Sequence, residues 1–498
     1  MGQLAKFANK AHFVYLVGAV VLAAIGYLWI VVFPVATFLL AIKIPIAMWY
    51  AEKSSDWLAI IALVFLTGLC AWITFDLVCT KIRTPNGHRL PRERYPELWA
   101  KVEQLTSDYR ARPIDQIRLS NRFDLEIERT PTTGLPALHT QTLFIGLPLL
   151  QAVSTDHLSV LLARKISMMP RLTNWPTAWL YHLRSTWYRY SKDFQGWTPG
   201  KLLMTMWFSW YAPLYIRYTI HLARRCELAA DSNALRLHDM WSVEEAITTA
   251  TLHKAFVENK LWPALLRMSQ KYPNPPLLPF SNMEKLIEKE LDRDRAHRLL
   301  EGLLQAKAQD DMHTPTLRQR WRSLSHNRPR VPAVLRSSAA QRYLKSTLKP
   351  LQEMYDKLWL RSHLPQWKER NARAQQDRQR LKLLLEQVPK DLLSNDEIWE
   401  CTLLVRQYMG QEKSIELYKA LLATEPQDAR VYFNIGSFLL SCRDSQGVDA
   451  LETAMSMDDR FTPDACELIS EFMNFTGERR KAKTWQRRAV QYSGEAVA

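Results

Sequence analysis

Two long apolar runs dominate the hydrophobic pattern near the start of the chain. The stretch from Phe13 to Ile42 contains no charged residue, and the stretch from Leu58 to Cys79 contains only Asp76. Each run exceeds the roughly 20 residues that a helix needs to cross the hydrocarbon core of a bilayer. The first run is also too long for the apolar part of a signal peptide. The pattern therefore predicts two transmembrane helices.

Charged residues around these runs indicate their orientation. Basic residues precede the first run and follow the second: Lys6, Lys10, Lys81, Arg83, Arg89, Arg92 and Arg94. Cytoplasmic flanks are enriched in Lys and Arg, so we expect both chain ends and the large domain in the cytoplasm. Pro34 and Pro45 interrupt the end of the first run. We interpret residues 35–50 as the end of a tilted helix followed by an interfacial turn, not as a third span.

A third apolar stretch, Leu202 to Ile220, has a different composition. It is rich in Trp and Tyr and contains Pro213 and Arg217. Amphipathic aromatic side chains are typical of the membrane interface. We expect a helix packed beside the membrane surface, although insertion into the membrane remains an alternative.

The last hundred residues repeat a helical pattern. Trp399, Tyr432 and Cys466 are spaced by 33 and 34 residues, and each is expected near the start of a helix. Second helices are expected at Ser414–Leu422, Gly447–Met457 and Arg479–Gln491, and small residues suited to close helix packing occur at Gly436, Ala450 and Ala454. The period resembles that of tetratricopeptide repeats, which stack helix pairs around a concave binding surface. An ordinary helical bundle is the alternative.

The charge and cysteine content of the chain limit the kinds of binding partner that we expect. The 498 residues carry a formal net charge of +16, and residues 312–352 contain nine basic and no acidic side chains. No helix-turn-helix, zinc-finger or aromatic RNA-binding pattern accompanies this charge, which argues against nucleic acid as the partner. Anionic lipid headgroups or a protein partner suit it better. The six cysteines lack paired spacing, which argues against a zinc ribbon or a disulfide framework.

Candidate chemistry lies on a helix predicted before residue 170. The segment from Leu143 to Met169 resembles the helix on which membrane gluzincins carry the motif A-H-E-x-x-H. This zinc metallopeptidase family includes the CAAX-prenyl endopeptidases and the heat-shock membrane proteases. Here the motif reads Arg164-Lys165-Ile166-Ser167-Met168. Arg164 and Met168 stand at the positions of the two zinc-binding histidines, and Lys165 stands at the position of the general base.

Further segments extend this resemblance over roughly residues 83–352. Arg224-x-x-Glu227-x-x-Ala230-Asp231 is similar to the family's R-x-x-E-x-x-A-D helix, in which the glutamate is the third zinc ligand and the aspartate orients a histidine. The segment from Thr177 to Tyr190 resembles a linker helix of bacterial members. Residues 313–317 with Arg320 look like their T-H-P-x-L-x-x-R element, with His and Thr exchanged. The resemblance also implies a small sheet, for which Ile117–Leu119 and Thr142–Ile145 are suitable strands.

The substitutions argue against a catalytic zinc ion. Only Glu227 and Asp231 remain as donors, and zinc sites need three or four. His157 is nearly two helical turns from Arg164, and His221 and Cys226 lie on a different helical face from Glu227. We therefore expect no zinc or other cofactor and no catalytic residue.

The same residues predict what replaces the metal. Two carboxylates buried without a cation would be costly, and the planar guanidinium of Arg164 can pair with both. We expect Arg164 to form a salt bridge with Glu227 or Asp231, and Met168 to fill the second ligand's volume as apolar packing. Lys165 is expected on a more accessible position, where its removal would matter little.

These observations predict a mainly α-helical chain with an α+β gluzincin-like domain. The expected parts are a membrane anchor (1–82), a peptidase-like domain (83–350), a charged connecting helix (351–392) and helical repeats (393–498). We expect an inactive peptidase homologue in a membrane, as in a bacterial inner membrane, that serves as a protein-binding scaffold or regulator. An active metalloendopeptidase with a noncanonical site and a purely structural membrane scaffold with a filled cleft are the alternatives.

Overall fold

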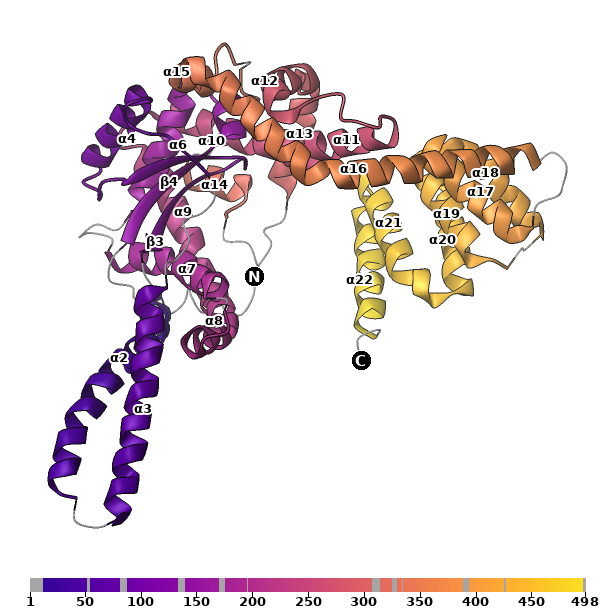
Figure 1. The fold of residues 1–498 in the computed structure, drawn as a ribbon. Helices are drawn as coiled ribbons and strands as arrows, with labels where there is room; N and C mark the ends of the chain where they lie inside the picture. Colours follow the sequence, from indigo (N-terminus) through magenta and orange to yellow (C-terminus); the bar gives the residue numbers. More distant parts are fainter. Residues whose placement is uncertain are drawn as a thin grey trace. The chain divides into compact units, whose positions relative to one another are not determined.

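The chain is mainly helical with one small mixed sheet, in agreement with the sequence prediction (Figure 1). The structure is a computed structural model that describes residues 12–51, 54–80, 87–132, 139–169, 175–194, 196–306, 314–324, 329–333, 335–387, 394–424 and 427–495. Two compact units form: residues 1–266 with 277–362, and residues 267–276 with 363–498.

The first unit contains the anchor, the sheet and the helices around it. Its main elements are α2 (His12–Trp49), α3 (Ser54–Cys79), β1 (His88–Arg89), α4 (Pro96–Asp108), β2 (Gln116–Ser120), β3 (Leu125–Pro131), β4 (His139–Gly146), α5 (Leu147–Ala152), α6 (Thr155–Ser167), α7 (Trp175–Asp193), α8 (Pro199–Tyr218), α9 (Ile220–Ala234), α10 (Met240–Phe256), a π-helical turn (Val257–Leu261), α11 (Trp262–Arg267), α12 (Pro279–Glu290), α13 (Arg293–Gln305), α14 (Leu317–Leu324) and α15 (Ala339–Leu344).

Helices α2 and α3 are both long and apolar enough to cross a membrane, as the sequence predicts. They pack against each other, and Thr37 and Thr74 approach within hydrogen-bond distance at 3.3 Å. The interfacial turn expected before Tyr50 is wrong, because α2 continues as one helix to Trp49 with Pro34 and Pro45 inside it. Apolar spanning helices tolerate proline when side chains and neighbouring helices satisfy the freed backbone groups.

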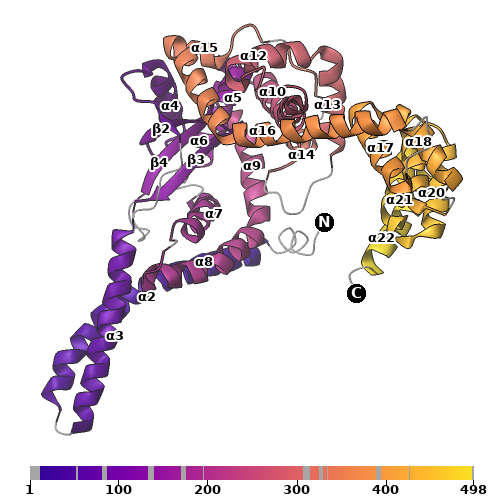
Figure 2. The ribbon, with the colours of Figure 1, turned by 45° about the vertical axis from the view of Figure 1, so that its right-hand side comes forward.

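Helix α8 packs along the first half of α2 (Figure 2). The rings of Tyr15 and Tyr218 stack at 5.1 Å between centroids, and those of Trp29 and Trp207 stack at 4.3 Å. Asp76, the one charge in the second apolar run, accepts a hydrogen bond from the backbone N–H of Gly200 at the start of α8. The aromatic stretch noted in the sequence is therefore an extension of the α2–α3 core.

The four-stranded sheet has the order β1-β2-β4-β3. Strands β2 and β4 are parallel, with Ile117 opposite Leu143 and Leu119 opposite Ile145, whereas β1 and β3 pair antiparallel at the two sides. The two strands expected from the sequence are thus the inner pair of the sheet. The chain passes from β4 directly into α5 and then α6, so the sheet fixes where α6 begins.

Helix α16 (Leu348–Gln387) is a single helix of 40 residues that begins in the first unit and ends in the second. The expected connecting segment, 351–392, is helical over its described part. The expected boundary at 350 lies inside this helix.

The second unit contains three helix pairs after α16. These are α17 (Asn395–Tyr408) with α18 (Gln411–Thr424), α19 (Ala429–Ser441) with α20 (Gln446–Met457), and α21 (Thr462–Phe475) with α22 (Arg479–Glu495). A Cβ on Gly436 would lie 2.9 Å from the carbonyl oxygen of Gly447, so the backbones of α19 and α20 need glycine to approach. The expected pairing of helices is confirmed.

Candidate functional site

Helix α6 carries the degenerate motif in its last turn. Ser154 caps the start of the helix by accepting a hydrogen bond from the backbone N–H of His157. Arg164 and Lys165 follow nearly three turns later, and α6 ends at Ser167. Met168 terminates the helix and therefore lies at its end as a buried apolar side chain.

Arg164 contacts both carboxylates of helix α9. Its Nη2 lies 2.5 Å from Oε2 of Glu227, and its Nε donates to Oδ1 of Asp231. Glu227 and Asp231 are one helical turn apart, so both side chains face α6 from the same side of α9. All three side chains are buried. The structure thus brings together the three residues that the sequence analysis singled out for a salt bridge.

Lys165 belongs to the same cluster. Its Nζ lies 2.9 Å from Oε1 of Glu227, and only 17% of its side chain is exposed. Lys165 is thus more exposed than Arg164, whose side chain is 8% exposed, as expected from the sequence, but its contact with Glu227 was not expected. The contact forms because Glu227 has two carboxylate oxygens, and each accepts from a different cation of α6.

Two further donors were not foreseen. Arg320 of α14 donates through Nε and Nη2 to Asp231, at 2.8 and 2.9 Å. Tyr181 of α7 donates its hydroxyl to Oε1 of Glu227 at 3.0 Å. The sequence flagged Arg320 only as part of a motif, and Tyr181 only as part of a linker helix. Neither carries a local pattern that reveals a partner 89 or 46 residues away.

The start of α14 positions Arg320. The backbone N–H of Gln319 donates to Oγ1 of Thr316, while the N–H of Thr316 donates to the side chain of Gln319. This reciprocal capping fixes the first turn of the helix and so directs the following residue. His313, which the motif places just before, lies outside the described residues.

The five charged groups, called the ionic cluster below, are Arg164, Lys165, Arg320, Glu227 and Asp231. Burial alone would raise the pKa of Glu227, but the nearby charges of Lys165 and Arg164 outweigh burial and hold its pKa below the ordinary range. Burial is likewise outweighed at Asp231 by Arg164 and Arg320, so its pKa is also lowered. Burial opposes the charge of Arg164, yet Asp231 and Glu227 raise its pKa. Both acids are therefore ionised and neutralised from within the protein.

The residues present do not fit a zinc ion. A guanidinium group lies against both remaining carboxylates, where an additional cation would be repelled. Among the residues that the structure describes, no group of three or more His, Cys, Asp or Glu side chains has the arrangement of a metal site. His157 is directed to Glu245, with 3.7 Å between Nε2 and Oε2, and not to this cluster. Burial raises the pKa of the Cys226 thiol to about 12, which disfavours the thiolate in the metal-free protein.

No protein-family model, curated protein or solved structure matches this chain.

Proposed function

We propose that this chain is a catalytically inactive homologue of the membrane gluzincin peptidases that acts as a membrane-anchored, protein-binding scaffold. The observation that carries the proposal is the contact of Arg164 with both Glu227 and Asp231. In a zinc peptidase the corresponding carboxylates hold or orient the metal site, and the metal-bound water is the nucleophile. Here the same acids are occupied by cations of the chain itself.

General-base catalysis is also unsupported at this site. The position between the two ligand positions is Lys165, whose ammonium is engaged by Glu227. A protonated amine that donates to a carboxylate has no lone pair to accept a proton from water. The alternative of an active endopeptidase with a noncanonical site would therefore need a nucleophile elsewhere in the chain.

Metal content and proteolysis test this proposal together. We expect the purified full-length protein to contain no stoichiometric zinc and to show no chelator-sensitive cleavage of casein. One equivalent of zinc, together with cleavage that disappears in Glu227→Ala, would overturn the proposal. A matched positive control is Arg164→His combined with Lys165→Glu and Met168→His, which restores the family's ligands and base at the same three positions.

The binding role is assigned to the helix pairs of the second unit. Stacked helix pairs present extended surfaces to other polypeptides, and Leu403 and Phe475 are large apolar residues exposed on α17 and α21. We expect photo-crosslinking residues at these two positions to capture a common polypeptide in cells. Leu237, an equally apolar exposed residue of the first unit, is the matched control. Equal capture from all three positions, or none, would favour the purely structural scaffold.

Orientation in the membrane is part of the same proposal. We expect a reporter after Ala498 and a reporter before Phe13 both to register in the cytoplasm, because basic residues flank both spans. The α2–α3 connection should then be accessible only from the opposite side. Labelling of that connection from the cytoplasmic side would contradict this orientation.

A further inference from the structure

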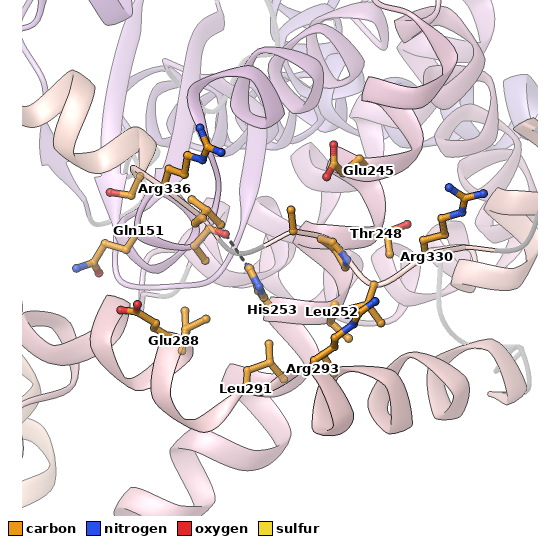
Figure 3. A pocket seen from close by; sticks show the side chains of 18 of the residues that line it. Gln151, Glu245, Thr248, Leu252, His253, Glu288, Leu291, Arg293, Arg330 and Arg336 are labelled. Carbon is orange, nitrogen blue, oxygen red and sulfur yellow. Dashed lines mark hydrogen bonds between the residues drawn. The ribbon is translucent and has the colours of Figure 1, made fainter.

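A cavity of about 1100 Å³ lies in the first unit, on helices other than those that hold the two acids of the ionic cluster. Its walls come from α5, α10, α12, α13 and α14, and from the extended segment that precedes α15. Figure 3 shows Gln151 and Glu288 on one side of this cavity and Glu245 and Thr248 on the other. The sequence analysis did not single out any of these residues.

Three lining residues, Gln151, Glu244 and His253, form what is called the cavity floor below. They offer hydrogen-bond acceptors that have no donor. Gln151 is 3% exposed, and its Nε2 donates to the carbonyl oxygen of Phe280, but its Oε1 has no partner. Glu244 is 7% exposed, and its Oε1 also has no partner. Buried polar atoms are nearly always hydrogen-bonded, and an unsatisfied one is costly. Both residues line the cavity and keep acceptor capacity that no described residue uses, which favours a ligand that donates hydrogen bonds.

His253 contributes a third acceptor. Its Nδ1 lies 2.6 Å from the carbonyl oxygen of Ala152, shown as the dashed line in Figure 3. A carbonyl can only accept, so Nδ1 carries the hydrogen and Nε2 keeps a lone pair. Burial, the largest effect, lowers the pKa of His253 to about 4, so the ring is neutral at physiological pH.

The walls carry charges of both signs, with four glutamates and three arginines. The glutamates are Glu244, Glu245, Glu284 and Glu288, and Glu245 also lies 3.7 Å from His157. Oε1 and Oε2 of Glu284 accept from Ser338 and Gln341, which are neutral. The lining arginines come from α13 and from the segment before α15, and the described residues show no ion pair between them and these four glutamates. Figure 3 shows the guanidinium of Arg336 directed away from His253, and Arg330 lies 6.0 Å over the ring of Trp241.

Apolar side chains complete the lining. Leu252, Ile287, Leu291 and the indole of Trp321 lie beside the acceptors. An aliphatic stem that ends in a cationic group packs its methylenes on such surfaces while its head reaches polar partners. A bare inorganic cation would leave these apolar walls without a function.

From this lining we infer that the cavity binds an alkyl-ammonium or alkyl-guanidinium group, with the nitrogen head donating to Glu244, Gln151 and His253. Such a group belongs to a Lys or Arg side chain of a polypeptide or to a free alkyl amine. The inference does not depend on the proposed function, because it rests on a different set of residues. Evidence against the proposed function therefore does not affect this inference, and evidence against this inference does not affect the proposed function.

Isothermal titration of the full-length protein in detergent tests this inference. The probes are N-acetyl-lysine methylamide and N-acetyl-arginine methylamide for the polypeptide source, and cadaverine and agmatine for the free amine. N-acetyl-norleucine methylamide is the neutral isostere, and N-acetyl-glutamate methylamide is the anionic control. We expect saturable binding by at least one cationic pair and none by the two controls. The pair that binds identifies the source.

Substitutions of the acceptor residues test whether the cationic probes bind in this cavity. Glu244→Gln keeps the volume and removes the charge, and we expect it to weaken binding of the cationic probe about tenfold or more. Glu301→Gln, an exposed acid of α13 outside the cavity, is the matched control and should leave binding unchanged. If Glu244→Gln does not fold, Gln151→Met, which removes a second proposed acceptor at similar volume, carries the same test. No binding by any cationic probe, equal binding of the norleucine or glutamate probe, or equal weakening by Glu301→Gln would overturn the inference.

Discussion

The ionic cluster and the cavity floor are two regions of the same unit. They differ in whether the oxygens of their buried acids have hydrogen-bond partners. In the cluster, Glu227 and Asp231 receive donors from α6, α7 and α14. On the cavity floor, Glu244 is almost as buried but has an oxygen without any partner. A buried carboxylate that the chain neutralises itself is a structural element, whereas one left unpaired is available to a ligand. The comparison therefore separates a cluster whose acids are paired within the chain from a cavity that holds an unpaired acid.

The largest expected effect is the removal of Arg164. Arg164→Ala leaves two buried carboxylates with weaker compensation, so we expect a loss of about 3–5 kcal/mol in the free energy of unfolding. Chemical unfolding in detergent measures this loss. Arg298→Ala, an exposed arginine of α13, is the matched control and should change the free energy little. A loss for Arg164→Ala no larger than that of the control would show that the cluster is not a structural element.

The next largest effect is expected on lowering the pH, which should reduce the stability that the ionic cluster provides. The pKa values of Glu227 and Asp231 are lowered in the folded protein by the adjacent cations, against the effect of burial. Their contribution to stability is therefore complete above the ordinary carboxyl pKa of about 4 and is lost as pH falls below it toward the lowered values. We expect the unfolding free energy to fall steeply below about pH 4. The slope should be shallower in Arg164→Ala, and equal slopes in the two proteins would contradict this assignment.

Lys165→Ala should have a smaller effect than Arg164→Ala. Lys165 contacts one acid, and Glu227 keeps Arg164 and Tyr181 as donors in its absence. A hydrogen bond to a charged group contributes about 1.5–3 kcal/mol, and we expect a loss in this range or below it. Lys289→Ala on the exposed face of α12 is the control. A loss equal to that of Arg164→Ala would mean that Lys165 contributes as much as Arg164 to the cluster, which would contradict the assignment.

How much of the fold and of the ionic cluster could be predicted from the sequence depends on how far apart along the chain the contacting residues lie. Helices α2 and α3 and the C-terminal helix pairs follow from local patterns of apolar residues, whereas strands β2 and β4 were expected from the motif resemblance. The contact of Arg164 with Glu227 and Asp231 was anticipated because a motif resemblance placed two helices together. Arg320 and Tyr181 have no such signal, because their partners are set by the packing of α14 and α7.

One expectation failed. The turn expected before Tyr50 is absent, because α2 continues through Pro34 and Pro45 to Trp49, and apolar helices packed against neighbours tolerate proline. The contact of Lys165 with the second oxygen of Glu227 was not expected. The cavity floor was not anticipated at all, since Gln151, Glu244 and His253 come from two helices that are far apart in the sequence.

The smallest expected effect on stability comes from the cavity floor. Glu244→Gln removes a buried charge that has no cation partner among the described residues, so we expect the free energy of unfolding without ligand to stay within about 0.5 kcal/mol or to rise. The same unfolding measurement used for Arg164→Ala provides the comparison. A loss as large as that of Lys165→Ala would show that Glu244 is paired in the folded protein, and the contrast between the two regions would disappear.

A double-mutant cycle between Arg164 and Glu227 tests most directly whether the chain itself neutralises its buried acids. Arg164→Met and Glu227→Gln each remove one charge and retain most of the volume, and the unfolding free energies of both single variants and the double variant are measured. We expect the double variant to lose less stability than the two single losses added together, with a coupling of about 1–3 kcal/mol. Additive losses within about 0.3–0.5 kcal/mol would show that the two groups do not interact. Arg164 would then not be the group that neutralises Glu227 in place of a metal ion.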